Sequence, residues 1–148
     1  MDLGELLTPE QIKLNLAGST KFEVIEELLD VLMKAGKVGN RQQALDDLLE
    51  RERYLSTGLE KGLAVPHAKT GVVTELTMAF GISRQGVEFD SLDGKPAHFI
   101  FLVLSPRDTS GPHIKALAQI TRLFREGEMP ERLLQAESPE AILELLEQ

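Results

Sequence analysis

The sequence contains no cysteine, and its basic residues are outnumbered by its acidic ones. The absence of cysteine excludes disulfides, zinc–thiolate sites, iron–sulfur clusters and a cysteine nucleophile, and it fits a reducing compartment. The 16 lysines and arginines face 24 acidic residues, which gives a net charge of −8. This balance argues against a nucleic-acid partner, whose phosphates require a basic footprint, and against an anionic membrane surface.

Long hydrophobic runs are also absent. The longest one, Phe99 to Leu104, has six residues, whereas a membrane-spanning helix needs about 20. The chain opens with the acidic segment Met1-Asp2-Leu3-Gly4-Glu5, which differs from the basic start of a signal peptide. We therefore expect a cytoplasmic protein without direct membrane insertion, and the length of 148 residues predicts one domain over residues 1–148.

The apolar pattern predicts helices at both ends of the chain and strands in the middle. Capping residues at Thr20 and Asn40 predict helices that end near Gly36 and Tyr54. The expected strands are Leu63–Val65, Leu76–Ser83, Val87–Phe89 and Ala97–Ser105, and three later helices begin at Ser110-Gly111-Pro112, Met129-Pro130 and Ser138-Pro139. The last strand is apolar on both faces, so it is expected inside a covered sheet. The predicted fold is a single α/β domain with a mixed sheet of about five strands flanked by helices on both faces.

Several well-known catalytic patterns are missing from the sequence. It contains no GxxxxGK[ST] phosphate loop and no GxGxxG, GxSxG or HExxH motif. The only histidines are His67, His98 and His113, and no two of them stand at a spacing typical of metal ligands. We therefore expect neither a metal site nor a cofactor.

His67 is the strongest candidate for chemistry. It follows an expected strand that Pro66 ends, because proline disfavours a helical conformation at Val65. The imidazole is thus expected at the mouth of the sheet, beside the small Ala68. Neutral imidazole is both nucleophilic and deprotonated near pH 7. On spacing alone, however, a loop histidine without a function is the commoner explanation.

Other polar residues form a set suited to phosphate. His113 is expected in the first turn of a helix, where free amides attract anions. Arg51 can grip two phosphoryl oxygens with its planar guanidinium, and Ser56 and Thr57 offer hydroxyl donors. An exposed first-turn histidine and a solvated arginine are the alternatives. His98 is expected to be partly buried and bonded to the backbone.

The motifs around these residues resemble a known family. Gly62-Leu63-Ala64-Val65-Pro66-His67 resembles the phosphorylation-site signature of the type 2 enzyme IIA domain of the bacterial phosphotransferase system, the fructose/mannitol class that includes nitrogen-regulatory IIA proteins. Further segments resemble other parts of this family: Arg51-Glu52, Ser56-Thr57-Gly58, Gly86-Val87-Glu88-Phe89, Leu92-Asp93-Gly94-Lys95-Pro96 and Ser110 to Leu117. The resemblance extends from about Leu6 to the C-terminus.

The resemblance implies a phosphotransferase component whose His67 accepts a phosphoryl group from phospho-HPr. His67 would pass it to a cysteine of an enzyme IIB domain on another chain, as expected for a free-standing IIA. Arg51 and His113 fall on the family's two active-site partners, which position the phosphoryl group and stabilise its charge. Ser56 and Thr57 match the polar loop beside them, and Glu52 matches the acid after the arginine, with a supporting role. The implied fold is an α/β sandwich around a mixed sheet.

Two other functions stay open on the sequence. The chain could be a nitrogen-regulatory module whose phosphorylation controls binding to regulatory target proteins, without sugar transport. The opening Leu6 to Glu10 favours this function slightly, whereas Ser83-Arg84-Gln85-Gly86 and Asp108 to Gly111 look equally like fructose-type proteins. An interaction domain without phosphate chemistry is the third alternative. The sequence does not indicate the sugar.

Overall fold

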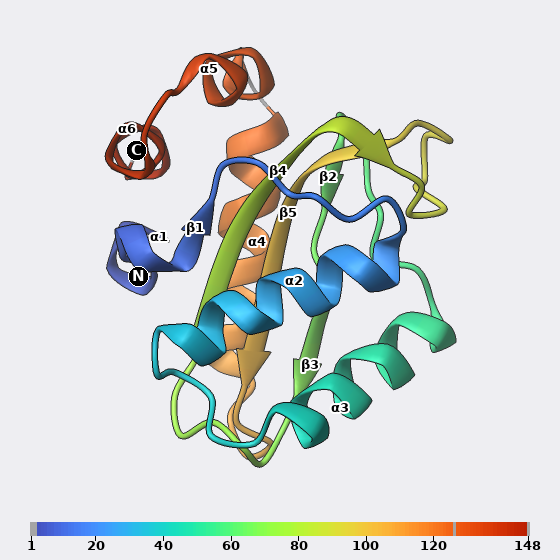
Figure 1. The fold of residues 1–148 in the computed structure, drawn as a ribbon, viewed down its shortest axis with the longest axis vertical. Helices are drawn as coiled ribbons and strands as arrows, with labels where there is room; N and C mark the ends of the chain where they lie inside the picture. The colour runs from blue at the N-terminus through green and yellow to red at the C-terminus, as the bar shows by residue number, and fades with distance from the viewer. Residues whose placement is uncertain (1–2, 126, 148) are drawn as a thin grey trace.

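A mixed sheet of five strands runs through the computed structural model, which describes residues 3–125 and 127–147 (Figure 1). The strand order is β1-β4-β5-β2, and β3 pairs with β5 beyond the end of β2. The strands β4 and β5 are antiparallel, whereas β1 is parallel to β4, and β2 and β3 are parallel to β5. Their bounds are β1 Ile12–Lys13, β2 Leu63–Ala64, β3 His67–Lys69, β4 Thr77–Val87 and β5 Ala97–Ser105.

The central strand β5 divides the hydrophobic interior into two halves. Because successive side chains of a strand point to opposite faces, Ile100 and Leu102 enter one core and Phe99 and Phe101 enter the other. All four are at most 2% exposed. The expectation that Ala97–Ser105 is a strand covered on both faces is confirmed with the same bounds.

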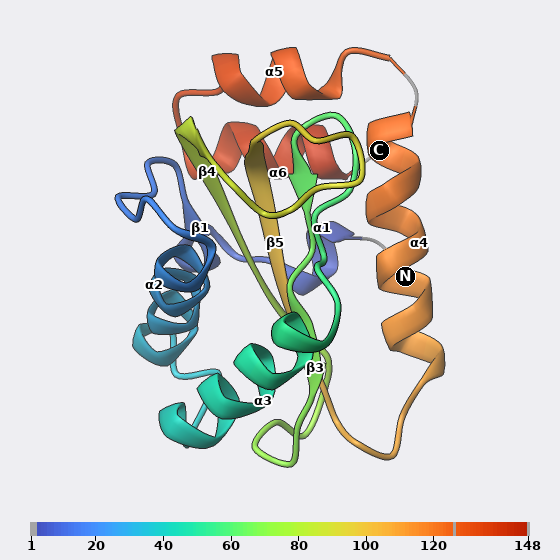
Figure 2. The same cartoon turned by 90° about the vertical axis from the view of Figure 1, so that its right-hand side faces the viewer.

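Two long helices, α2 (Lys21–Lys34) and α3 (Arg41–Tyr54), cover one face of the sheet (Figure 2). Helix α2 begins with a capping box in which Thr20 and Glu23 bond each other's backbone amides. Helix α3 begins where the Asn40 side chain accepts from the Gln43 amide. Both predicted helices are confirmed, and their apolar stripes fill the first core.

Four helices contribute to the second core: α4 (Gly111–Arg125) lies on the far side of the sheet from α2 and α3 (Figure 2), and the other three lie beside its β1 edge (Figure 1). These three are α1 (Leu3–Leu6), α5 (Met129–Gln135) and α6 (Pro139–Leu146), and a short 3₁₀ helix, Pro9–Gln11, follows α1. The predicted starts of α4, α5 and α6 agree with the structure to within one residue. Phe124 of α4 packs against Phe99 with tilted rings and against Phe101 edge-to-face, so aromatic contacts join this layer to the sheet.

Two strand predictions need correction. The chain does not leave the sheet after Pro66, because β3 starts at His67 and continues along the same side of β5 as β2. Pro66 only interrupts the pairing, since it lacks an amide hydrogen, while its carbonyl still accepts from Val103 N. The predicted strand Val87–Phe89 does not form, because Val87 is the last residue of a longer β4.

The predicted fold class is confirmed: the described residues form a mixed five-stranded sheet with helices on both faces. Met1 and Asp2, the first residues of the acidic opening segment, lie outside the described residues. Within the part of the chain that the structure describes, no helix combines the length and apolar character needed to cross a membrane.

Candidate functional site

Three of the residues singled out in the sequence meet at one cavity of about 750 Å³. His67 is the first residue of β3, Arg51 lies in the last turn of α3, and His113 lies in the first turn of α4. The ring centroids of His67 and His113 are 5.1 Å apart, in an edge-to-face arrangement. The fold therefore brings together side chains that are up to 62 positions apart in the chain.

The His67 ring is oriented by its own chain. Its Nδ1 lies 2.8 Å from the carbonyl oxygen of Val65. Because a carbonyl oxygen only accepts, Nδ1 carries the proton, and Nε2 keeps its lone pair. Burial lowers the pKa of His67 below its ordinary value, the bond to Val65 opposes this, and the positive charge of Arg51 lowers the pKa further. The ring is thus neutral at pH 7, with Nε2 available as a nucleophile.

His113 is buried, unlike the exposed first-turn histidine that was the alternative from the sequence. It is 7% exposed, and its Nδ1 lies 2.5 Å from the hydroxyl of Ser105 at the end of β5. Burial lowers the pKa of His113 to about 4, and a proton on His67 and the charges of Lys69 and Arg51 act in the same direction. His113 is therefore a neutral hydrogen-bonding group rather than a cation at pH 7.

Basic side chains line the cavity although the protein is acidic overall. Arg53, Lys69 and Arg107 join Arg51 and the two histidines, with Asp47 and Glu50 among the acids on the wall. The Arg51 guanidinium donates to the carbonyl of Leu55 at 2.6 Å, a contact that anchors it at the C-terminal end of α3. A cavity with several cations and a neutral nucleophilic imidazole can attract an anionic group and form a bond to it.

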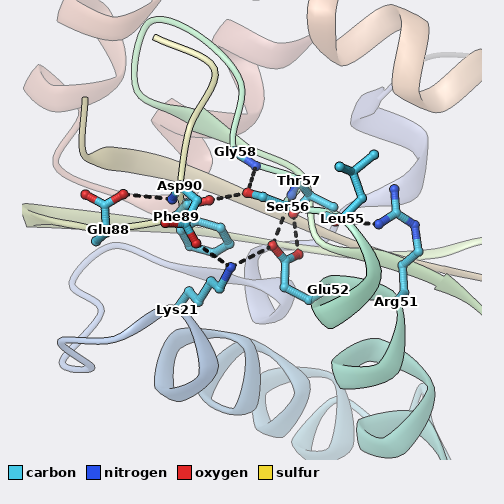
Figure 3. A network of polar contacts seen from close by, with 10 residues as sticks. All are labelled: Lys21, Arg51, Glu52, Leu55, Ser56, Thr57, Gly58, Glu88, Phe89 and Asp90. Atoms are coloured by element: carbon cyan, nitrogen blue, oxygen red, sulfur yellow. Dashed lines mark hydrogen bonds and ion pairs between the residues drawn. The ribbon is translucent and has the colours of Figure 1, made fainter. Parts of the chain in front are cut away.

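Ser56 and Thr57 lie beside His67, but their hydroxyl groups have partners within the protein (Figure 3). The Ser56 hydroxyl donates to the carbonyl of Phe89 and accepts from the Gly58 amide. Thr57 is 4% exposed, and its hydroxyl donates to Glu52 Oε1 at 2.6 Å. In this arrangement both hydroxyls shape the loop, so their predicted contact with phosphate stays a prediction.

The carboxylate of Glu52 lies at the centre of this loop network (Figure 3). It is 2% exposed and also accepts from the backbone amide of Thr57 at 3.0 Å. Lys21 Nζ lies 3.4 Å from Glu52 Oε2 and 3.1 Å from Asp90 Oδ2. Lys21 thus connects the start of α2 with the last turn of α3 and with the segment that follows β4.

His98 lies apart from the other two histidines. Its Nδ1 is 2.8 Å from the carbonyl of Ser83, and the residue is partly buried. The prediction of a backbone-bonded strand histidine is confirmed. Over residues 3–125 and 127–147, no group of three histidine or acidic side chains could hold a metal ion, and the expectation that none is needed stays a prediction.

The sequence did not single out the cavity cations Lys69 and Arg107, nor two residues that support the site from outside it. Ser105 contacts His113 from the end of a strand. Lys21 lies in a different helix from Glu52, 31 positions earlier in the chain, and contacts it. Each carries a local signal only for its own element, a strand end and the first turn of a capped helix. Neither signal indicates which side chain lies opposite in the folded chain.

Residues 5–148 match the family model described as "Phosphoenolpyruvate-dependent sugar phosphotransferase system, EIIA 2". The chain is 42% identical over its whole length to the fructose-specific EIIABC component of Bacillus subtilis, of which it covers only 23%. It is 39% identical to the fructose-specific EIIA component of Haloferax volcanii, over 98% of this chain and 94% of that protein.

Two solved structures have the same fold. The crystal structure of the nitrogen regulatory protein IIA-Ntr from Neisseria meningitidis is 31% identical, with a TM-score of 0.90 over 97% of this chain and 98% of that one. In the complex of enzyme IIA-mannitol with phosphorylated enzyme IIB-mannitol from Escherichia coli, the matching chain is 26% identical. Its TM-score is 0.81, over 95% of this chain and 96% of that one.

Proposed function

The chain belongs to the EIIA 2 family of the phosphoenolpyruvate-dependent sugar phosphotransferase system, and on this premise we propose that it is a phosphoryl carrier that uses His67. The proposed donor is phospho-HPr, and the proposed acceptor is the cysteine of an enzyme IIB domain. Arg51 and His113 are the proposed partners of the phosphoryl group.

One observation carries this proposal. The His67 Nδ1 proton is donated to Val65 O, which leaves the Nε2 lone pair in a cavity shared with Arg51 and His113. A phosphoryl carrier needs a nucleophile that is deprotonated at neutral pH, and groups that offset the charge of its cargo. This cavity holds both and adds an arginine and a second histidine beside His67. Among the described residues, the cavity at His98 is lined by Lys61 and Lys95 but by neither an arginine nor a second histidine.

In the accepting step, His67 Nε2 attacks the phosphorus of phospho-HPr in line. The Nε2–P bond forms while the bond from phosphorus to HPr breaks, and its electron pair stays with HPr. The imidazole becomes more positive as Nε2 bonds to phosphorus, and the Val65 carbonyl stabilises that charge through the Nδ1 proton. Arg51 and a ring N–H of His113 bind the equatorial oxygens, which carry roughly −1.5 to −2 charges after transfer.

The donating step reverses this chemistry at His67. A cysteine thiolate of the IIB domain attacks phosphorus, and the P–Nε2 bond returns its electron pair to the imidazole. The similarity to enzyme IIA in a complex with phosphorylated enzyme IIB supports an acceptor of this kind. The fructose-specific relatives favour a IIB partner of a fructose-type system.

A regulatory function is the second candidate. The match to IIA-Ntr extends over almost the whole of both chains, with a TM-score of 0.90. In this function His67 is phosphorylated in the same way, and the added negative charge changes which target proteins bind at the cavity. The two candidates differ in the acceptor, so the test of the carrier step applies to both.

The carrier step is tested by intact-mass measurement after incubation with phosphoenolpyruvate, enzyme I and HPr. We expect a single acid-labile phosphoryl group on the wild-type protein and none on the His67→Ala variant. His98→Gln is the matched control and is expected to be phosphorylated like the wild type. No transfer from HPr that is itself shown to be phosphorylated would contradict the proposal. Addition of candidate IIB domains then separates transport from regulation.

A further inference from the structure

The hydroxyl of Ser105 contacts His113 and has no part in the phosphoryl-transfer steps proposed above. Ser105 is the last residue of β5, is 1% exposed, and has its Oγ 2.5 Å from Nδ1 of His113. Its backbone is fixed in the sheet, since the carbonyl of Ser105 accepts from Thr70 N at 2.8 Å. A rigid strand end therefore holds one edge of the His113 ring.

The direction of this hydrogen bond follows from the partners that each group has. A hydroxyl can donate or accept, and a neutral imidazole carries its one proton on Nδ1 or on Nε2. Among the described residues, the Ser105 hydroxyl bonds only to His113. If Nδ1 donated, the hydroxyl hydrogen would be buried without a partner, which is unfavourable. If the hydroxyl donates to Nδ1, both the hydroxyl hydrogen and the Nδ1 lone pair have a partner.

We propose that Ser105 is a positioning residue that holds His113 in its Nε2–H tautomer, so that His113 donates a hydrogen bond to the phosphoryl group on His67. This inference rests on the proposed function. Phosphoryl oxygens that are ionised only accept hydrogen bonds. In the other tautomer, Nε2 would present a lone pair to these oxygens, and the two groups would repel.

The low charge of His113 makes the choice of tautomer matter. A protonated imidazole would have an N–H on both nitrogens and would need no such selection. Burial and the neighbouring Arg51, Lys69 and His67 keep the ring neutral at pH 7, since the pKa of His113 falls to about 4. In a neutral ring, the nitrogen that carries the single proton decides whether His113 attracts or repels the phosphoryl group on His67.

The inference is tested with the matched pair Ser105→Thr and Ser105→Val, which have nearly the same shape but differ in the hydroxyl. Nitrogen-15 NMR of the histidine rings in the unphosphorylated protein reports directly which nitrogen of His113 carries the proton. We expect Nε2–H in the wild type and in Ser105→Thr, and a mixture of tautomers in Ser105→Val. The rate of His67 phosphorylation should fall roughly 3- to 10-fold in Ser105→Val, equivalent to the loss of one neutral hydrogen bond, and stay near the wild-type rate in Ser105→Thr.

Two outcomes would overturn the inference. A proton on Nδ1 of His113 in the wild type reverses the assigned direction, and this spectrum needs no variant to fold. An equal loss of rate in both variants, with an unchanged His113 spectrum, shows that Ser105 acts only through packing. If phosphorylated HPr transfers nothing to the wild type, the proposed function fails. A normal transfer rate with the proton on Nδ1 of His113 contradicts only the role assigned to Ser105.

Discussion

At the scale of single residues, the reactivity of His67 depends on a contact with its own chain two positions earlier. The Val65 carbonyl takes the Nδ1 proton, and the burial of the ring lowers its pKa. The prolyl residue between them restricts the backbone, so the carbonyl and the imidazole are held together by local geometry. In the proposed function, three consecutive residues orient the nucleophile, and the distant residues Arg51 and His113 bind the phosphoryl group.

Replacement of Arg51 tests the largest proposed electrostatic contribution. We expect Arg51→Ala to slow phosphorylation of His67 by phospho-HPr about 100-fold or more, as the loss of one preorganised donor can. The measurement is rapid quenching followed by intact mass. Arg122→Ala, which removes an exposed charge on α4 outside the cavity, is the control and should leave the rate unchanged. A rate of Arg51→Ala equal to that of the control contradicts the assigned role.

Replacement of Gly58 tests whether the loop beside His67 needs its close approach to the 89–91 segment. A Cβ at Gly58 would lie 2.5 Å from the Ser91 hydroxyl and 2.9 Å from the Phe89 carbonyl oxygen, whereas one at Gly39 would meet nothing within 4 Å. Gly58→Ala is therefore expected to displace the loop, to cost about 1–3 kcal/mol in the free energy of unfolding, and to slow phosphorylation. Gly39→Ala should change neither quantity, and parallel behaviour of the two variants in urea unfolding and transfer assays would refute the argument.

At the scale of elements, α2 and α3 do more than cover the sheet. The loop that leaves α3 carries Ser56, Thr57 and Gly58, and the Glu52 carboxylate holds it from below through two bonds to Thr57 (Figure 3). Lys21, at the start of α2, offsets the charge of that carboxylate. The position of the loop beside His67 thus depends on how the two helices pack together.

Removal of the Lys21 charge tests this dependence. Lys21→Met leaves the buried Glu52 carboxylate with Thr57 alone, and we expect the free energy of unfolding to fall by about 1–3 kcal/mol, with slower phosphorylation. Lys13→Met removes an ion pair whose lysine side chain is 42% exposed, and Glu27 keeps its bonds to the amides of Ala17 and Gly18. This change should cost less than about 1 kcal/mol and leave the transfer rate unchanged. Urea unfolding and the phosphorylation assay on both variants give the comparison. Equal effects of the two lysines would show that Lys21 is an ordinary surface cation.

The sequence predicts those elements whose signals are local. Thr20 and Asn40 carry capping signals, and the helices after them begin where expected. The short strand β1 was missed because two residues, Ile12 and Lys13, show no period, and only pairing with β4 makes them a strand. The return of the chain to the sheet at His67 was missed for the same reason, since the strand forms through non-local pairing with β5.

The candidate site shows the same limit. Arg51, His67 and His113 were identified from local context and family resemblance, and the structure places all three at one cavity. Ser105, which contacts His113, and Lys21, which contacts Glu52, were not identified, because only the packing of distant elements creates these contacts. The spacing of residues in the sequence does not predict such contacts.

At the scale of the whole molecule, the charge distribution is uneven. The net charge is −8, yet Arg51, Arg53, Lys69 and Arg107 gather at the cavity with two histidines. A locally positive site in an acidic protein attracts an anionic group while the remaining surface repels unselected anions. Burial, together with this local positive charge, lowers the pKa of His113 and keeps the ring neutral at pH 7.

This neutrality makes stability depend on pH. His113, with its pKa lowered from an ordinary 6.5 to about 4, binds fewer protons in the folded state than in the unfolded state between these values. The free energy of unfolding therefore falls as the pH drops through this window, and His67 contributes in the same direction. We expect the loss between pH 7 and pH 5.5, measured by urea unfolding, to be smaller in His113→Gln than in the wild type. An identical loss in both proteins contradicts the assignment.

The interruption at Pro66 places the nucleophile at the junction of the two halves of the interior. Val65, just before it, packs with α4 and its neighbours, and Ala68, just after His67, packs with α2 and α3. Each layer therefore supplies one wall of the histidine's surroundings. If His67 carries the phosphoryl group as proposed, loss of either layer would remove the geometry of the nucleophile, so the chain would accept phosphate only when both halves of its interior are intact.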